Sequence, residues 1–158
     1  MSSRRQKSTT ACMILAAGKG TRMNSAQNKV LHTLLGVPMV AYAVESARGL
    51  GATSIVGVLG HQLKEVAKAL DDRFGPGCVT VVEQKVQKGT GHAVRLGLGP
   101  LADFDGLVVI LYGDVPLLRM ETLGSHCSGG LSFYRPFQNK KQPGKGPHYT
   151  LITRAARG

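Results

Sequence analysis

Two kinds of hydrophobic pattern alternate along the first two thirds of the chain. Short runs that are apolar at nearly every position are followed by longer stretches in which apolar residues recur three or four positions apart. The first pattern is typical of strands buried on both faces, and the second of helices with one buried face. The predicted strands are Ala11–Ala17, Ser54–Gly60, Cys78–Glu83 and Leu107–Tyr112, and the predicted helices are Pro38–Leu50, Leu63–Leu70 and Thr90–Leu98.

This order of elements predicts an α/β fold of the Rossmann-like, layered kind, with a mostly parallel sheet covered by helices on both faces. In open parallel sheets, ligands bind outside the carboxyl ends of the strands. Three segments leave strands at that edge, and we expect functional residues in them: Gly18–Lys29, Glu83–Gly91 and Gly113–Leu118.

The pattern divides the chain into three parts. We expect a basic flexible tail (1–10), a core that carries the chemistry (11–122), and a basic, Gly/Pro/Ser-rich segment (123–158). In the last part, Gly, Pro and Ser make up 12 of 36 residues, and only LSFY and YTLIT could form short strands. Two interpretations stay open for it, a genuine low-complexity tail or the product of out-of-frame translation or a cloning artefact. In either case the sheet is expected to be incomplete at its C-terminal side.

Composition narrows the class of protein. With 158 residues, 42% hydrophobic and 18% charged, the chain is neither disordered nor fibrous. No apolar run reaches the roughly 20 residues that span a bilayer, and the start does not read as a secretory signal. Three separated cysteines without metal-binding spacing favour the cytoplasm. The net charge of +11 suits nucleic acid, an acidic membrane or a phosphorylated small molecule.

The first motif, LAAGKGTRM, spans Leu15 to Met23. Small residues and glycines directly after a strand let the backbone approach a nucleotide closely. Lys19, Arg22 and Lys29 place three cations around this loop, as a triphosphate would require. The spacing fits neither a Walker A loop nor GxGxxG. An ordinary strand-to-helix turn with solvated charges is the alternative.

The second motif, EQKVQKGTGHA, follows the third predicted strand. Its Gln84 and Gln87 amides could read the edge of a base, while Gly89 and Thr90 could offer backbone and hydroxyl contacts. The alternative is a helix start capped at Thr90.

The third motif is ILYGDVPLL, in which Asp114 comes just after the last predicted strand. A carboxylate at this position suits Mg²⁺, which prefers hard oxygen ligands and bridges phosphates. The alternative is that Asp114 caps a turn.

Together and in this order, the three motifs and KVLHTLLGVPM resemble the sugar-nucleotide pyrophosphorylases. The likeness is closest to the uridyltransferase half of the bacterial bifunctional N-acetylglucosamine-1-phosphate uridyltransferase/glucosamine-1-phosphate acetyltransferases. It runs from about Met13 to Thr122, and QxxQxGTGHA and LYGDVPLL are its most specific parts.

The resemblance implies a reaction of UTP with N-acetylglucosamine 1-phosphate that gives UDP-N-acetylglucosamine and pyrophosphate, for peptidoglycan and lipopolysaccharide precursors in the cytoplasm. It implies that Leu15, Ala16, Ala17 and Gly18 line the uridine and ribose, that Gln84, Gly89 and Thr90 read the uracil, and that Tyr112 and Gly113 contact the nucleotide sugar. It further implies Arg22 and Lys29 as the catalytic residues that hold the phosphates, and Asp114 as a ligand of Mg²⁺. Because the attacking phosphate is already ionised, no general base is needed, and His32 and His92 are expected to be structural hydrogen-bonding residues.

The sequence also departs from that family. Asn28 replaces the usual proline before Lys29, and we expect it to loosen the loop. No segment in 123–158 matches the family's later sugar-binding strands or its second metal ligand, an asparagine. No β-helix for acetyl transfer follows, so that activity is expected to be missing, the uridyltransferase to be impaired, and the family's trimerisation through that domain to give no guide to the oligomeric state.

Two alternatives to the uridyltransferase stay open. One is a relative with another base or sugar, such as a thymidylyl- or guanylyltransferase. The other is a non-catalytic remnant that binds nucleotide or RNA. Only 5% of the residues are aromatic and none is Trp, which argues against a nucleic-acid partner.

Overall fold

The computed structural model describes residues 9–18, 28–116 and 148–151. The strands are β1 (Thr10–Ala16), β2 (Thr33–Leu34), β3 (Val37–Pro38), β4 (Ser54–Leu59), β5 (Thr80–Glu83), β6 (Leu107–Tyr112) and β7 (His148–Leu151). The helices are α1 (Met39–Gly49), α2 (Leu63–Phe74) and α3 (Thr90–Gly97), with single 3-10 turns η1 (Lys29–Leu31) and η2 (Gly99–Leu101). Within these described ranges, no helix is long and apolar enough to cross a membrane.

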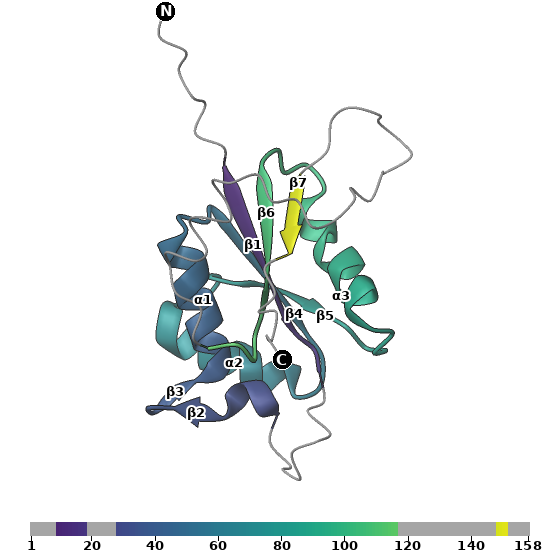
Figure 1. Cartoon of the computed structure of the whole chain (residues 1–158). Helices are drawn as coiled ribbons and strands as arrows, with labels where there is room; N and C mark the ends of the chain where they lie inside the picture. Colours follow the sequence, from purple (N-terminus) through teal and green to yellow (C-terminus); the bar gives the residue numbers. More distant parts are fainter. Residues whose placement is uncertain (1–8, 19–27, 117–147, 152–158) are drawn as a thin grey trace, which may run out of the picture.

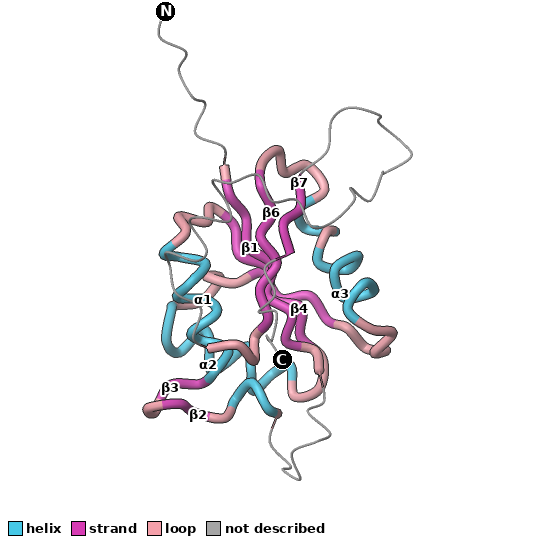
Figure 2. The backbone as a smooth tube through the Cα atoms, in the orientation of Figure 1, coloured by secondary structure: helices cyan, strands magenta, loops and turns pink. Residues whose placement is uncertain are grey.

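Five strands form one sheet in the order β5-β4-β1-β6-β7, and all four pairings are parallel (Figure 1). Figure 2 shows the strands in magenta and the helices in cyan. β1 lies in the middle and pairs with β4 on one side and β6 on the other. From β1 the chain goes first to β4 and β5 and then returns to β6 on the opposite side. The strand order therefore reverses between β1 and β6, the point at which ligands bind in open α/β sheets.

Helices cover both faces of the sheet, α1 and α2 on one face and α3 on the other (Figure 1). Along β1, Cys12 and Ile14 pack in the core on the side of α1 and α2, whereas Met13 and Leu15 pack in the core on the side of α3. Successive side chains of a strand point to opposite faces, so a strand covered on both faces is apolar at every position. The predicted α/β layered fold is confirmed.

The described structure differs from the predicted elements in three main respects. α2 ends at Phe74, four residues after the predicted end at Leu70. β5 begins at Thr80, two residues after the predicted start at Cys78. The segment before α1 forms a short antiparallel hairpin, β2–β3, which the hydrophobic pattern did not indicate. The hairpin turn consists of Leu35 and Gly36, both at positive φ (52° and 78°), as the tightest hairpin turns require. At the C-terminal side, β7 overlaps the second of the two strands considered possible there and pairs with β6.

Candidate functional site

A cavity of about 400 Å³ opens at the carboxyl ends of the strands near the reversal point. Its described lining is Leu15, Ala16, Ala17, Gly18, Lys29, Val30, Gln84, Gln87, Gly89, Thr90, Ala93, Tyr112 and Asp114. All three sequence motifs contribute to it. The residues predicted for the site all line this cavity except Gly113, which lies behind one of its walls, and Lys19 and Arg22, which are outside the described residues.

The end of β1 and the residues just after it form one wall of the cavity, and two glycines stand behind this wall. A Cβ atom at Gly113 would lie 2.9 Å from the Cβ of Ala16, and one at Gly60 would lie 2.7 Å from the carbonyl oxygen of Ala17. The Gly113 N–H donates to the carbonyl oxygen of Leu15 at 2.9 Å. Gly113 is thus placed to support the wall from behind, and its predicted contact with the sugar stays a prediction.

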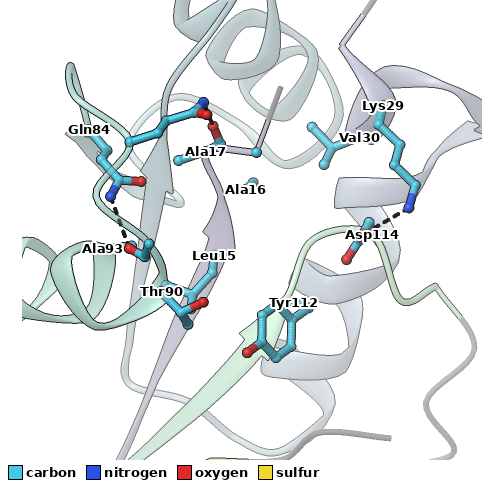
Figure 3. Close-up of a pocket in the computed structure, with 13 residues that line it drawn as sticks. Leu15, Ala16, Ala17, Lys29, Val30, Gln84, Thr90, Ala93, Tyr112 and Asp114 are labelled. Atoms are coloured by element: carbon cyan, nitrogen blue, oxygen red, sulfur yellow. Dashed lines mark hydrogen bonds and ion pairs between the residues drawn. The ribbon is translucent and has the colours of Figure 1, made fainter. Parts of the chain in front are cut away.

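Two opposite charges meet on one side of the cavity. Lys29, at the start of η1, and Asp114, in the turn after β6, form an ion pair with 2.9 Å between Nζ and Oδ2 (Figure 3). The two side chains are 37% and 38% exposed. Ion pairs this exposed contribute only about 0–1 kcal/mol, so phosphate oxygens and a cation could replace the pair at little cost.

Asp114 is the single carboxylate among the described residues that line the cavity. The described ranges contain no group of three or more His, Cys, Asp or Glu side chains that could hold a metal by themselves. Mg²⁺ is commonly bound through one or two carboxylates, with water and substrate phosphates as its other ligands. The residues present therefore fit a magnesium ion that binds together with a phosphate-bearing substrate.

Gln84 occupies the opposite side of the cavity from Lys29 and Asp114 (Figure 3). It is only 4% exposed, and its backbone N–H donates to the carbonyl oxygen of Leu59 at 2.7 Å. Its Nε2 donates to the carbonyl oxygen of Gly89 at 3.2 Å and lies 3.0 Å from Nδ1 of His92. With both amide hydrogens engaged in this way, Nδ1 of His92 accepts, and Oε1 of Gln84 is the atom left for a ligand.

The two histidines differ in their surroundings. His92 orients the Gln84 amide, which is the kind of structural role expected from the sequence. The Nε2 atom of His32, in contrast, is buried and has no hydrogen-bond partner within the described residues. The described residues provide no hydrogen bond to this nitrogen, and the hydrogen-bonding role expected of His32 stays a prediction.

Asn28 is held in place directly before Lys29, and its predicted loosening of the preceding loop stays a prediction, because residues 19–27 lie outside the described residues. Its side chain is buried, with the residue 1% exposed. Its N–H donates to Oε1 of Gln62 and its Nδ2 donates to the carbonyl oxygen of His61, each at 2.6 Å. Its Oδ1 accepts from the Val30 N–H at 3.3 Å. A proline would lack both the N–H and the side-chain amide, so asparagine here adds contacts that place Lys29.

We expect Asn28→Ala to lower the free energy of unfolding by about 1–3 kcal/mol, because it removes the side-chain hydrogen bonds of a buried residue. Urea denaturation followed by circular dichroism measures this change. Thr33→Ala, at an exposed position nearby, serves as the control and should change stability little. Equal stability of Asn28→Ala and the unmodified chain would contradict the anchoring role.

These features define a layered α/β domain with a polar cavity at the carboxyl ends of its strands, and the comparison with protein families identifies the class. Residues 12–154 match the MobA-like NTP transferase domain. The chain belongs to this family of nucleotidyltransferase domains.

Among curated proteins, the chain is similar to the bifunctional protein GlmU. It is 53% identical to GlmU of Geobacter sulfurreducens over 114 residues, which cover 72% of this chain and 23% of that protein. It is 47% identical to GlmU of Cutibacterium acnes over 113 residues, covering 72% of this chain and 27% of that protein. The chain thus spans about a quarter of the length of these relatives. The predicted resemblance to an N-terminal portion of this enzyme is confirmed.

Solved structures share the fold. A nucleotidyl transferase from Methanothermobacter is 25% identical, with a TM-score of 0.62. The match covers 73% of this chain and 55% of the nucleotidyl transferase chain. A UDP-glucose pyrophosphorylase complexed with UDP-glucose is 25% identical, with a TM-score of 0.51. The match covers 59% of this chain and 42% of the pyrophosphorylase chain. Rv0371c of Mycobacterium tuberculosis, solved with manganese, is 20% identical with a TM-score of 0.62 over 78% of this chain and 60% of its own, and shows the fold alone.

Proposed function

We propose that this chain carries the site of a Mg²⁺-dependent uridyltransferase that makes UDP-N-acetylglucosamine and pyrophosphate from UTP and N-acetylglucosamine 1-phosphate. The observation that carries the proposal is the cavity, in which three separate sequence motifs meet with charges on one side and a fixed amide on the other. The identity to GlmU proteins supports UTP and N-acetylglucosamine 1-phosphate as the substrates.

The reaction is an exchange of phosphate linkages. An oxygen of the sugar phosphate attacks the α-phosphorus of UTP, a new P–O bond forms, and the bond between the α-phosphorus and the oxygen bridging to the β-phosphate breaks in line. The electron pair of that bond leaves with pyrophosphate. Because the attacking oxygen already carries negative charge, no proton has to be removed, and the protein acts by positioning the groups and by reducing their repulsion.

The residues on the side of the cavity that holds Lys29 and Asp114 would reduce the repulsion between the phosphate groups. Lys29, released from Asp114, would bind phosphate oxygens, and Arg22 is proposed to assist it. Asp114, released in turn, would hold Mg²⁺ together with those phosphates. A bound Mg²⁺ supplies Lewis-acid neutralisation of the phosphate charge.

The side of the cavity that holds Gln84 favours binding of a pyrimidine base with an N–H at position 3. Gln84 presents Oε1, an acceptor, because its Nε2 is engaged by Gly89 and His92. Uracil carries a donor at N3, whereas cytosine carries an acceptor there. A buried acceptor facing the cytosine acceptor would leave both unpaired, which costs about 1–3 kcal/mol.

The experiment that tests the function is turnover with matched substrate pairs. We expect the chain to release pyrophosphate and form UDP-N-acetylglucosamine from UTP and N-acetylglucosamine 1-phosphate in the presence of Mg²⁺. The dissociation constant for CTP should be about 5- to 150-fold higher than that for UTP, as measured by isothermal titration calorimetry.

The variant His92→Leu distinguishes a loss of base recognition from a general loss of nucleotide binding. His92→Leu removes the acceptor that holds the Gln84 amide, so the preference for UTP over CTP should shrink while triphosphate binding persists. Faster turnover with another nucleotide or with another sugar phosphate would instead assign the chain to a relative of different specificity. Absence of binding to any nucleoside triphosphate would refute the proposed function.

A further inference from the structure

One side chain of the loop between β5 and α3 crosses to the residues that follow β1. The Nε2 atom of Gln87 donates a hydrogen bond to the backbone carbonyl oxygen of Ala17, 70 positions earlier in the chain. Both residues line the cavity. Because β4 separates β1 from β5 in the sheet, this hydrogen bond joins two walls that no direct strand pairing connects.

The loop around Gln87 is held in place on its own side. The N–H of Lys88 donates to the carbonyl oxygen of Val86 at 3.0 Å, which closes a three-residue turn with Gln87 at its centre. The next residue, Gly89, is held through its carbonyl oxygen by the Gln84 amide. These two hydrogen bonds restrain the backbone around Gln87, whose side chain reaches Ala17.

The carbonyl oxygen of Ala17, which accepts this hydrogen bond, is restricted in its movement as well. Ala17 is only 5% exposed. Its carbonyl oxygen lies so close to Gly60 that a Cβ atom there would come within 2.7 Å of it. The oxygen thus lies close to the Gly60 backbone and accepts a hydrogen bond from the Gln87 amide, and both contacts restrict its movement.

Fixing this carbonyl also fixes the next amide. The carbonyl of Ala17 and the N–H of Gly18 belong to one peptide unit, and in a trans unit they point in opposite directions. No described peptide bond is cis. The Gly18 N–H makes no backbone hydrogen bond within the described residues, and Gly18 lines the cavity. Without an anchor, the peptide next to a glycine rotates readily.

We propose that Gln87 is a positioning residue that orients the Ala17–Gly18 peptide, so that the Gly18 N–H is presented to an oxygen of the bound nucleotide. This inference rests on the proposed function, because it assumes that a nucleotide occupies the cavity. Gln87 acts through the backbone of another segment and reads no base itself.

The test compares Gln87→Leu and Gln87→Glu with the matched control Val86→Ala, which alters an exposed neighbour in the same turn. Leucine keeps the size of the side chain but lacks a donor, and an ionised glutamate places an acceptor against the Ala17 carbonyl. Three quantities are measured on the full chain: the ¹H–¹⁵N resonance of Gly18 without ligand, the dissociation constant for UTP with Mg²⁺, and the midpoint of thermal unfolding.

Both Gln87 variants are expected to shift the Gly18 resonance and to raise the UTP dissociation constant about tenfold, with an unfolding midpoint like that of the unmodified chain. Val86→Ala should leave all three quantities unchanged. Unaltered UTP affinity in Gln87→Leu, when the unmodified chain binds UTP, would overturn the positioning role alone. Absence of UTP binding by the unmodified chain would overturn the proposed function, and the inference with it.

Discussion

Lys29→Met is expected to weaken UTP binding by about 10- to 150-fold. The substitution keeps the length of the side chain but removes the one described cation that lines the cavity. Hydrogen bonds to charged groups contribute about 1.5–3 kcal/mol, which corresponds to that range of dissociation constants. Isothermal titration calorimetry with Mg²⁺ and UTP measures the change, and release of pyrophosphate measures its effect on turnover.

The chain offers a matched control for this variant. Lys68 also forms an ion pair, with Asp72 on α2 at 2.5 Å, but it does not line the cavity. Lys68→Met removes the same charge from the same kind of pair and should leave UTP affinity unchanged. If both variants lowered the affinity equally, net charge would be the cause, and the phosphate-binding role of Lys29 would be refuted.

Asp114→Asn is expected to reduce turnover by roughly 10²- to 10³-fold, the range seen when one group that stabilises charge in a transition state is removed. Asparagine has nearly the same shape, so the turn after β6 should persist while the negative charge is lost. Mg²⁺ should then have little effect on the affinity for UTP, because the single carboxylate among the described lining residues no longer holds the cation. Binding of Mn²⁺ in the presence of UTP, followed by electron paramagnetic resonance, reports this loss independently of turnover.

Asp72→Asn is the corresponding control, because it breaks the Lys68 pair and leaves the cavity intact. Metal binding by Asp114→Asn as tight as in the unmodified chain would show that the cation is held elsewhere.

The double variant Lys29→Met with Asp114→Asn should lose less turnover than the losses of the two single variants combined, because the two partners of the ion pair act on the same phosphates.

The edge of the sheet that carries the site could be predicted because its signals are local. The buried strands are apolar at every position, as in the run from Ala11 to Ala17, and such runs show where parallel strands end. Glycines and polar side chains directly after those strands then mark the residues that reach the ligand edge. Leu15 to Gly18, Gln84 and Asp114 all line the cavity for this reason.

Contacts between segments distant along the chain could not be predicted in this way. The hydrogen bonds of Asn28 with Gln62 and His61 place Lys29, yet nothing near Asn28 in the sequence indicates those partners. The hairpin before α1 was missed because strands of two residues are too short to show an alternating pattern.

The sequence by itself determined the layered α/β architecture and the three motifs at the ends of its strands, because hydrophobic periodicity and glycine placement act over a few residues. Only the tertiary structure decided that Lys29 faces Asp114 and that Gln84 presents an oxygen to the cavity. It also decided that Gln87 holds the carbonyl of Ala17. These arrangements depend on which strand ends the fold brings together and on the directions of individual hydrogen bonds, and neither leaves a periodic signal in the chain.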